Sequence, residues 1–176
     1  MLLALVSGMK LRILLLFALL SVAPMAGTQI AAQNPEPVNS KTFYEQALAL
    51  HEKHDLDGAI HALHEAIRLD PGYVDAHLKL GNYLGEKNDL DGAIAECREA
   101  LRIQPASPAV HWNLADLLRF KKDYESALAE GREAVRLAPD DPETHRALGS
   151  VLRDKGELDA AVAEYRKALA LKPAGG

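Results

Sequence analysis

Apolar and small residues recur along most of this chain at spacings of three and four, with charged residues between them. One such stripe comprises Leu90, Ala93, Ile94, Cys97, Ala100 and Leu101. This spacing places the stripe on one face of an amphipathic helix. Asp89 stands where an N-cap is expected, and Pro105 marks the stop because proline cannot continue a helix. A shorter stripe from Val74 to Leu84 predicts a preceding helix, so this segment is a helix–turn–helix.

The same pattern returns every 34 residues. Four columns keep this spacing through four copies: Pro71, Pro105, Pro139 and Pro173; Ala59, Ala93, Ala127 and Ala161; Ala66, Ala100, Ala134 and Ala168; Leu50, Leu84, Leu118 and Leu152. The repeats are 40–73, 74–107, 108–141 and 142–175. The third repeat follows Ser107 with Pro108 and the fourth follows Asp141 with Pro142, a cap followed by proline that is typical of a helix start. A fixed period of this length indicates a stacked repeat protein.

The framework of Leu148-Gly149, Leu152, Ala161, Tyr165, Ala168 and Pro173 resembles the tetratricopeptide repeat, and the resemblance covers residues 40–175. It implies an all-α fold, a right-handed α-solenoid of four helix–turn–helix repeats. Small residues on the first helices, Ala47, Gly81, Ala115 and Gly149, are expected to let paired helices approach closely. Two columns depart from the family's aromatic residues: Phe43, His77, His111 and His145; Leu63, Cys97, Gly131 and Tyr165. We expect the three histidines to be packing residues, and Gly131 to leave a local gap.

The N-terminal segment has the pattern of an export signal, and we do not expect it to belong to the folded repeats. Lys10 and Arg12 precede 11 apolar residues, 13–23, which is too short for a membrane span of about 20 residues. Cleavage is expected after Ala26 or Ala32, giving a signal peptide over 1–26 and a flexible linker over 27–39. The alternative is a retained membrane anchor, and either Met1 or Met9 serves as the start.

Composition narrows the function classes. Hydrophobic residues make up 48% and charged residues 26% of the 176 residues, as in folded soluble proteins. A formal charge of -5 and 5% aromatic residues argue against nucleic acid as a partner. The single cysteine, Cys97, excludes an intramolecular disulfide and a cysteine-based zinc cage, and its place on an inner stripe predicts a buried thiol. No cofactor is expected.

The resemblance places a concave groove along the first helices, where repeat proteins bind partners. The candidate groove residues are Tyr44, Asn82, Trp112, Asn113, Arg119, Phe120, Arg146 and Arg153. Aromatic rings offer apolar anchor area, asparagines can pair with a peptide backbone, and arginines suit acidic groups on a ligand. Leu78, Glu143 and Ala147 stand where family members that clamp a carboxylate carry basic residues, so such a clamp is not expected.

Two patterns suggest chemistry that we weigh against simpler roles. His51, His54, His61 and His64 crowd the first repeat, and histidine is a common metal ligand. The second pair lies largely away from the inner stripe of its helix, so structural or exposed roles are favoured over a metal enzyme. Asp-Leu-Asp-Gly at 55–58 and 89–92 lacks the later ligands of a calcium loop and is read as a turn with a cap.

The sequence therefore predicts a non-catalytic scaffold, exported to the periplasm or secreted, that binds a peptide or protein in its groove. A membrane-tethered assembly factor, with the N-terminal segment retained, is the alternative, followed by a histidine-based metal enzyme. Val162, Tyr165 and Leu169 end the array with no further helix to cover them. This end is expected to dock onto a second copy or onto another protein.

Overall fold

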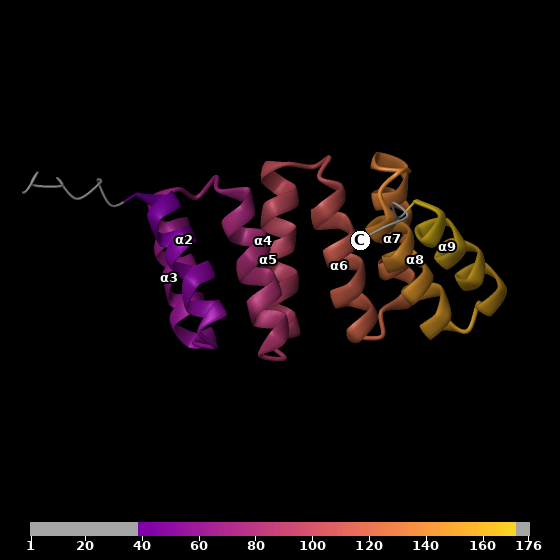
Figure 1. Cartoon of the computed structure of the whole chain (residues 1–176), viewed down its shortest axis with the longest axis horizontal. Coiled ribbons are helices and arrows are strands. Elements are labelled where there is room, and N and C mark those ends of the chain that lie inside the picture. Colours follow the sequence, from indigo (N-terminus) through magenta and orange to yellow (C-terminus); the bar gives the residue numbers. More distant parts are fainter. Residues whose placement is uncertain (1–38, 172–176) are drawn as a thin grey trace, which may run out of the picture. The chain divides into compact units, whose positions relative to one another are not determined.

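The computed structural model describes residues 39–171, which form eight α-helices and no strand and lie within one compact unit, Val38–Gly176. The helices follow one another in chain order (Figure 1): α2 Ser40–Glu52, α3 Leu56–Leu69, α4 Val74–Glu86, α5 Leu90–Ile103, α6 Pro108–Phe120, α7 Tyr124–Leu137, α8 Pro142–Lys155 and α9 Leu158–Leu171. Each 34-residue block holds one first helix (α2, α4, α6, α8) and one second helix (α3, α5, α7, α9). The all-α solenoid expected from the sequence is confirmed.

The expectations for the N-terminal segment lie outside the described residues, apart from Asn39. Asn39 was assigned to the linker, and its side chain caps α2 by accepting a hydrogen bond from the Thr42 backbone at 3.0 Å. Within residues 39–171, no helix is both long enough and apolar enough to cross a lipid bilayer.

The Asp-Leu-Asp-Gly segments are helix caps, as predicted. Asp55 and Asp89 accept hydrogen bonds from the backbone N–H of Gly58 and Gly92 at 2.9 and 3.0 Å. Glycine lets the aspartate approach closely, because a Cβ on Gly92 would lie 2.5 Å from Asp89 Oδ2. The third repeat has Asp123 and Ser126 there, and its cap bond lengthens to 3.3 Å.

A left-handed residue ends the first helix of every repeat. His54, Asn88 and Lys122 have φ of 62°, 64° and 63°, and Gly156 has 95°. The backbone N–H of the residue that follows each one returns to a carbonyl five positions earlier, at 2.9–3.0 Å in all four repeats. This is the Schellman arrangement, in which a left-handed residue lets the chain reverse while the last carbonyls stay paired. Only the fourth repeat uses glycine, the residue that adopts this conformation without strain.

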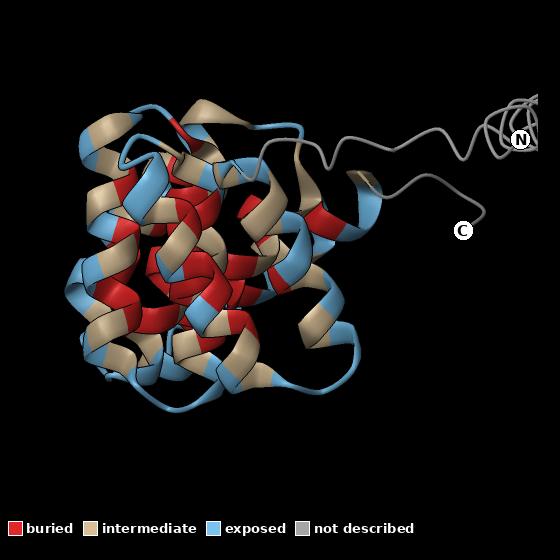
Figure 2. Ribbon diagram, turned by 90° about the vertical axis from the view of Figure 1, so that its left-hand side faces the viewer, coloured by how far each residue is buried: buried red, intermediate tan, exposed pale blue. Residues whose placement is uncertain are grey.

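Small residues bring paired helices into contact. A Cβ on Gly81 of α4 would lie 3.1 Å from the Ala93 carbonyl and 3.2 Å from Cys97 Sγ, both in α5. In the last pair, a Cβ on Gly149 would lie 2.8 Å from the Tyr165 ring. The gap expected at Gly131 is wrong: Leu148, from α8 of the next repeat, occupies that space, and a Cβ on Gly131 would lie 3.3 Å from Leu148 Cδ1. Buried residues line the facing sides of the helices throughout (Figure 2).

The three predicted packing histidines also form hydrogen bonds with both ring nitrogens. Nδ1 of His77, His111 and His145 lies 2.7, 2.6 and 2.6 Å from Glu96, Glu130 and Glu164 of the paired second helix. Nε2 of each ring lies 2.9–3.1 Å from the carbonyl of the proline six residues earlier. Each histidine thus ties a helix pair to the turn that leads into it. In the first repeat, Phe43 stands in place of the histidine and Ala62 in place of the glutamate.

We expect Lys122→Gly to stabilise the protein by about 0.5–1 kcal/mol, because a left-handed non-glycine residue carries a steric cost. Urea unfolding measures the change. Asn88→Gly is the matched control and should gain less, since asparagine tolerates this conformation. A lower midpoint for Lys122→Gly than for wild type would contradict the strain argument.

We expect His111→Phe to destabilise the protein by about 1–3 kcal/mol, because Glu130 and the Pro105 carbonyl lose their donor. Adding Glu130→Ala recreates the Phe43 and Ala62 pair of the first repeat and should cost little further. A double-mutant cycle of urea unfolding should therefore give a coupling of about 1 kcal/mol or more. Additive effects would show that the two side chains do not interact.

Candidate functional site

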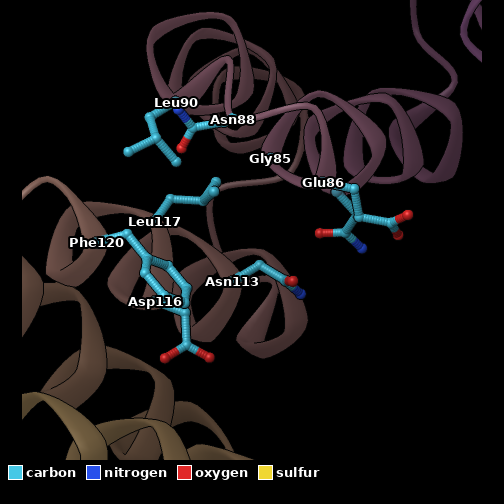
Figure 3. A pocket seen from close by; sticks show the side chains of 9 residues that line it. Gly85, Glu86, Asn88, Leu90, Asn113, Asp116, Leu117 and Phe120 are labelled. Carbon is cyan, nitrogen blue, oxygen red and sulfur yellow. The ribbon is translucent and has the colours of Figure 1, made fainter.

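A pocket of about 450 Å³ lies between the second and third repeats, where α4 and α6 are neighbours. Its walls come from both first helices and from the turn into α5 (Figure 3). It is lined by Asn82, Gly85, Glu86, Asn88, Leu90, Asn113, Asp116, Leu117 and Phe120. This pocket lies between two of the first helices, where the resemblance places the groove.

The pocket combines apolar area with acidic groups. Leu90, Leu117 and Phe120 supply the apolar part, and Phe120 is 60% exposed, although large aromatic side chains are usually buried. Glu86 and Asp116 supply carboxylates from opposite helices. An apolar surface flanked by carboxylates suits an apolar side chain that has a cationic neighbour.

Three of the eight predicted groove residues meet in this pocket: Asn82, Asn113 and Phe120. The Asn113 amide nitrogen donates to the Ala109 carbonyl of its own helix at 2.7 Å. That bond fixes the side chain and leaves the amide oxygen as an acceptor.

The predicted arginines do not offer free charges. Arg119 donates to Asp116 at 3.2 Å and to Asp154 at 2.7 Å, and its guanidinium lies 4.2 Å from the centre of the Phe120 ring. The hydrogen bond from Arg119 is the main reason that the pKa of Asp154 lies below its ordinary value. A cation that already has carboxylate partners attracts a ligand's acid far less than a free one.

Arg146 and Arg153 are paired in the same way. Arg146 bonds to Glu143 at 2.6 Å and to Asp116, across the repeat boundary, at 3.4 Å. Arg153 bonds to Asp154 at 2.8 Å. Arg119 and Arg146 thus link the third and fourth repeats, whereas Arg153 pairs within its own helix. The role of these arginines toward acidic ligand groups stays a prediction.

Tyr44 and Trp112 lie away from the pocket. Tyr44 packs against Tyr73, with ring centres 5.2 Å apart, and the Arg146 guanidinium lies 5.8 Å from the centre of the Trp112 ring. Glu86 and Asp116 fall on the side of the first helices that the resemblance makes concave, whereas the sequence did not identify Gly85, Asn88, Leu90 and Leu117 as pocket residues. Leu117 is a buried residue of α6, Asn88 lies in the turn after α4, and Leu90 begins α5. Their positions in the sequence do not mark them as groove residues, and the folded structure brings them together.

The crowded histidines of the first repeat spread apart. His51 stacks on Tyr83 with ring centres 4.3 Å apart and lies 3.0 Å from Glu86, whereas His54, His61 and His64 are exposed. Over residues 39–171, no group of three or more His, Cys, Asp or Glu side chains is arranged to hold a metal ion. Cys97 is fully buried, and burial raises the pKa of its thiol to about 12, which leaves almost no reactive thiolate at neutral pH.

Comparisons with known proteins agree with this architecture. Three family models, each described as tetratricopeptide repeat, match residues 44–108, 84–151 and 145–174. No curated protein matches the sequence.

Two solved structures of MamA are similar in fold. A crystal structure of MamA is 19% identical over 77% of this chain and 80% of its own, with a TM-score of 0.68. A structure of MamA from Desulfovibrio magneticus RS-1, residue 41 to the end, is 20% identical over 76% of this chain and 75% of its own, with a TM-score of 0.67. At this identity the likeness concerns the fold alone.

Proposed function

The chain belongs to the tetratricopeptide repeat family, and on that premise we propose that it is a non-catalytic scaffold that binds a peptide or protein segment in the groove of its first helices. The observation that carries the proposal is the pocket between α4 and α6, with the exposed Phe120 ring at its edge. Large exposed aromatic residues beside a pocket are typical anchors of protein interfaces.

The chemistry of the pocket narrows the ligand. An aliphatic or aromatic side chain would bury area against Leu90, Leu117 and Phe120. A lysine or arginine beside it would reach Glu86, whose side chain is 50% exposed, whereas Asp116 is already bonded to Arg119 and Arg146. The Asn113 amide oxygen would accept from a backbone N–H of the ligand. We therefore favour a ligand with an apolar side chain next to a basic one over the acidic ligand groups that Arg119, Arg146 and Arg153 suggested.

The test is selection from a random 12-residue peptide library displayed on phage, followed by affinity measurement with synthetic copies of the enriched peptides. We expect enrichment of an apolar residue next to lysine or arginine. Phe120→Ala should weaken binding by about 30-fold, the effect of losing roughly 2 kcal/mol of apolar contact. Glu86→Gln should weaken the basic peptides by a smaller factor.

Leu69→Ala is the matched control, because Leu69 is also an exposed apolar residue, at 43%, and does not line the pocket. It should bind as wild type does. Equal affinity of Phe120→Ala and wild type for every enriched peptide would place the ligand elsewhere and refute the groove as the site.

We also propose that the protein acts outside the cytoplasm, on the strength of the basic residues and the short apolar run over 13–23. Intact-mass measurement of the protein from its native membrane and soluble fractions should give a chain that begins at Gly27 or Gln33. A full-length chain found only with membranes would instead favour the membrane-tethered assembly factor.

A further inference from the structure

The outer side of α9, the last helix in Figure 1, exposes three aliphatic residues. Leu158, Val162 and Leu169 are 61%, 46% and 70% exposed. Residues at the same positions of α3, α5 and α7 are buried or half-buried: Leu56, Leu90 and Tyr124; Ile60, Ile94 and Leu128; Ile67, Leu101 and Val135. In α3, α5 and α7 the corresponding face is covered by the repeat that follows. In α9 it is exposed.

The helices that provide this cover share one pattern. At positions i, i+4, i+7 and i+11 they carry Ala76, Leu80, Tyr83 and Lys87; Val110, Leu114, Leu117 and Lys121; Thr144, Leu148, Val151 and Lys155. These residues face the preceding repeat: Leu117 lies against Gly85 and Leu148 lies against Gly131. All nine residues at the first three positions are buried.

The lysine at i+11 completes the pattern with an ion pair. Lys87 pairs with Asp57 and Lys121 with Asp91, and Lys155 pairs with Glu125 at 2.9 Å. Each acid lies in the first turn of the preceding second helix. Asp159 has this position in α9 and no salt-bridge partner anywhere in the described part of the chain. The end of the array thus presents an aliphatic surface with one acid at its N-terminal edge.

A second copy stacked head to tail fits this surface poorly. Its α2 would supply Lys53 for Asp159, but it carries Gln46 where the covering helices have Leu80, Leu114 and Leu148. Gln46 is exposed in this structure, and burying its amide against aliphatic side chains without a partner is unfavourable.

Two copies joined tail to tail would place one α9 against the other. The exposed side of α9 carries Leu158, Val162, Tyr165 and Leu169 at i, i+4, i+7 and i+11, so it has leucine where the covering helices have lysine. The exposed face of α9 therefore fits a helix with the pattern of α4, α6 and α8 better than it fits a second copy of the chain.

We propose that the exposed face of α9 binds an amphipathic helix of another protein, antiparallel to α9, with apolar residues at i, i+4 and i+7 and a lysine or arginine at i+11. This helix would take the place that α4, α6 and α8 hold on the preceding repeats. A pocket of about 250 Å³ beside the C-terminal half of α9, lined by Pro142, Arg146, Tyr165, Ala168 and Leu169, leaves room for one further side chain of the bound helix.

The chain supplies both the probe and its control. The probe is a synthetic peptide with the sequence of residues 108–121, held helical by a lactam bridge on its outward side. The control is the peptide of residues 40–53 with the same bridge, which keeps the lysine but carries Thr42, Gln46 and Ala49 where the probe carries Val110, Leu114 and Leu117. Fluorescence anisotropy with the full chain should give at least about tenfold tighter binding of the first peptide, because it buries more apolar area at all three positions.

Variants of the surface locate the binding. Val162→Asp should weaken the 108–121 peptide by at least about 30-fold, since a buried charge would lack a partner. Ala163→Asp is the matched control, because its side is exposed in all four repeats, and it should bind as wild type does. Circular dichroism of each variant verifies that it remains folded.

A charge swap tests the ion pair separately. Asp159→Lys should weaken the wild-type peptide by about threefold, and a peptide carrying Lys121→Glu should restore binding to that variant. Equal binding of both peptides, or binding that Val162→Asp leaves unchanged, overturns the proposal. Light scattering that shows a dimer, converted to a monomer by Val162→Asp, also overturns it by showing that a second copy covers the face.

Discussion

The structure depends on one contact made three times: the apolar flank of a second helix is buried by the first helix of the next repeat. A single repeat cannot bury this flank, because the first helix of the repeat covers only one side of the second helix. The other side needs the next repeat to cover it. The contact therefore fixes the order of the helices, the periodic placement of leucine and alanine, and the small residues that let the helices approach. It also explains Gly131, whose missing side chain is replaced by Leu148 from the neighbouring repeat.

Polar groups surround this apolar contact and give it direction. Within a repeat, a buried histidine joins the first helix to a glutamate of the second helix and to the carbonyl of the preceding turn. Between repeats, a lysine at the end of one first helix reaches an acid at the start of the previous second helix. Apolar packing alone would tolerate sliding, since leucine columns resemble one another. The histidine hydrogen bonds within three repeats and the lysine ion pairs between repeats favour the observed register.

The sequence predicted those features that depend on neighbours along the chain or on the period. Helix starts at Asp89 and Pro142, the cap role of Asp-Leu-Asp-Gly and the buried Cys97 follow from local geometry and helical spacing. The state of the arginines was not accessible in the same way. Arg119 pairs with a residue 35 positions away, and such a pairing depends on rotamers and on the approach of adjacent repeats. The number of charged residues in a sequence is thus a poor guide to how many of them are free to bind a ligand.

The two surfaces differ in what they can recognise, and they are connected. The pocket between α4 and α6 has room for individual side chains, whereas the apolar residues of the α9 face have the spacing that a whole helix covers in the other repeats. No residue of that pocket belongs to the α9 face, so both surfaces can be occupied at once. Arg119 links them, because its guanidinium lies against Phe120 and bonds to Asp154 of α8, the helix paired with α9. In a linear array each repeat is stabilised by its neighbours, so a helix bound at the end would stabilise the fourth repeat and, through Arg119, restrain the ring at the edge of the pocket.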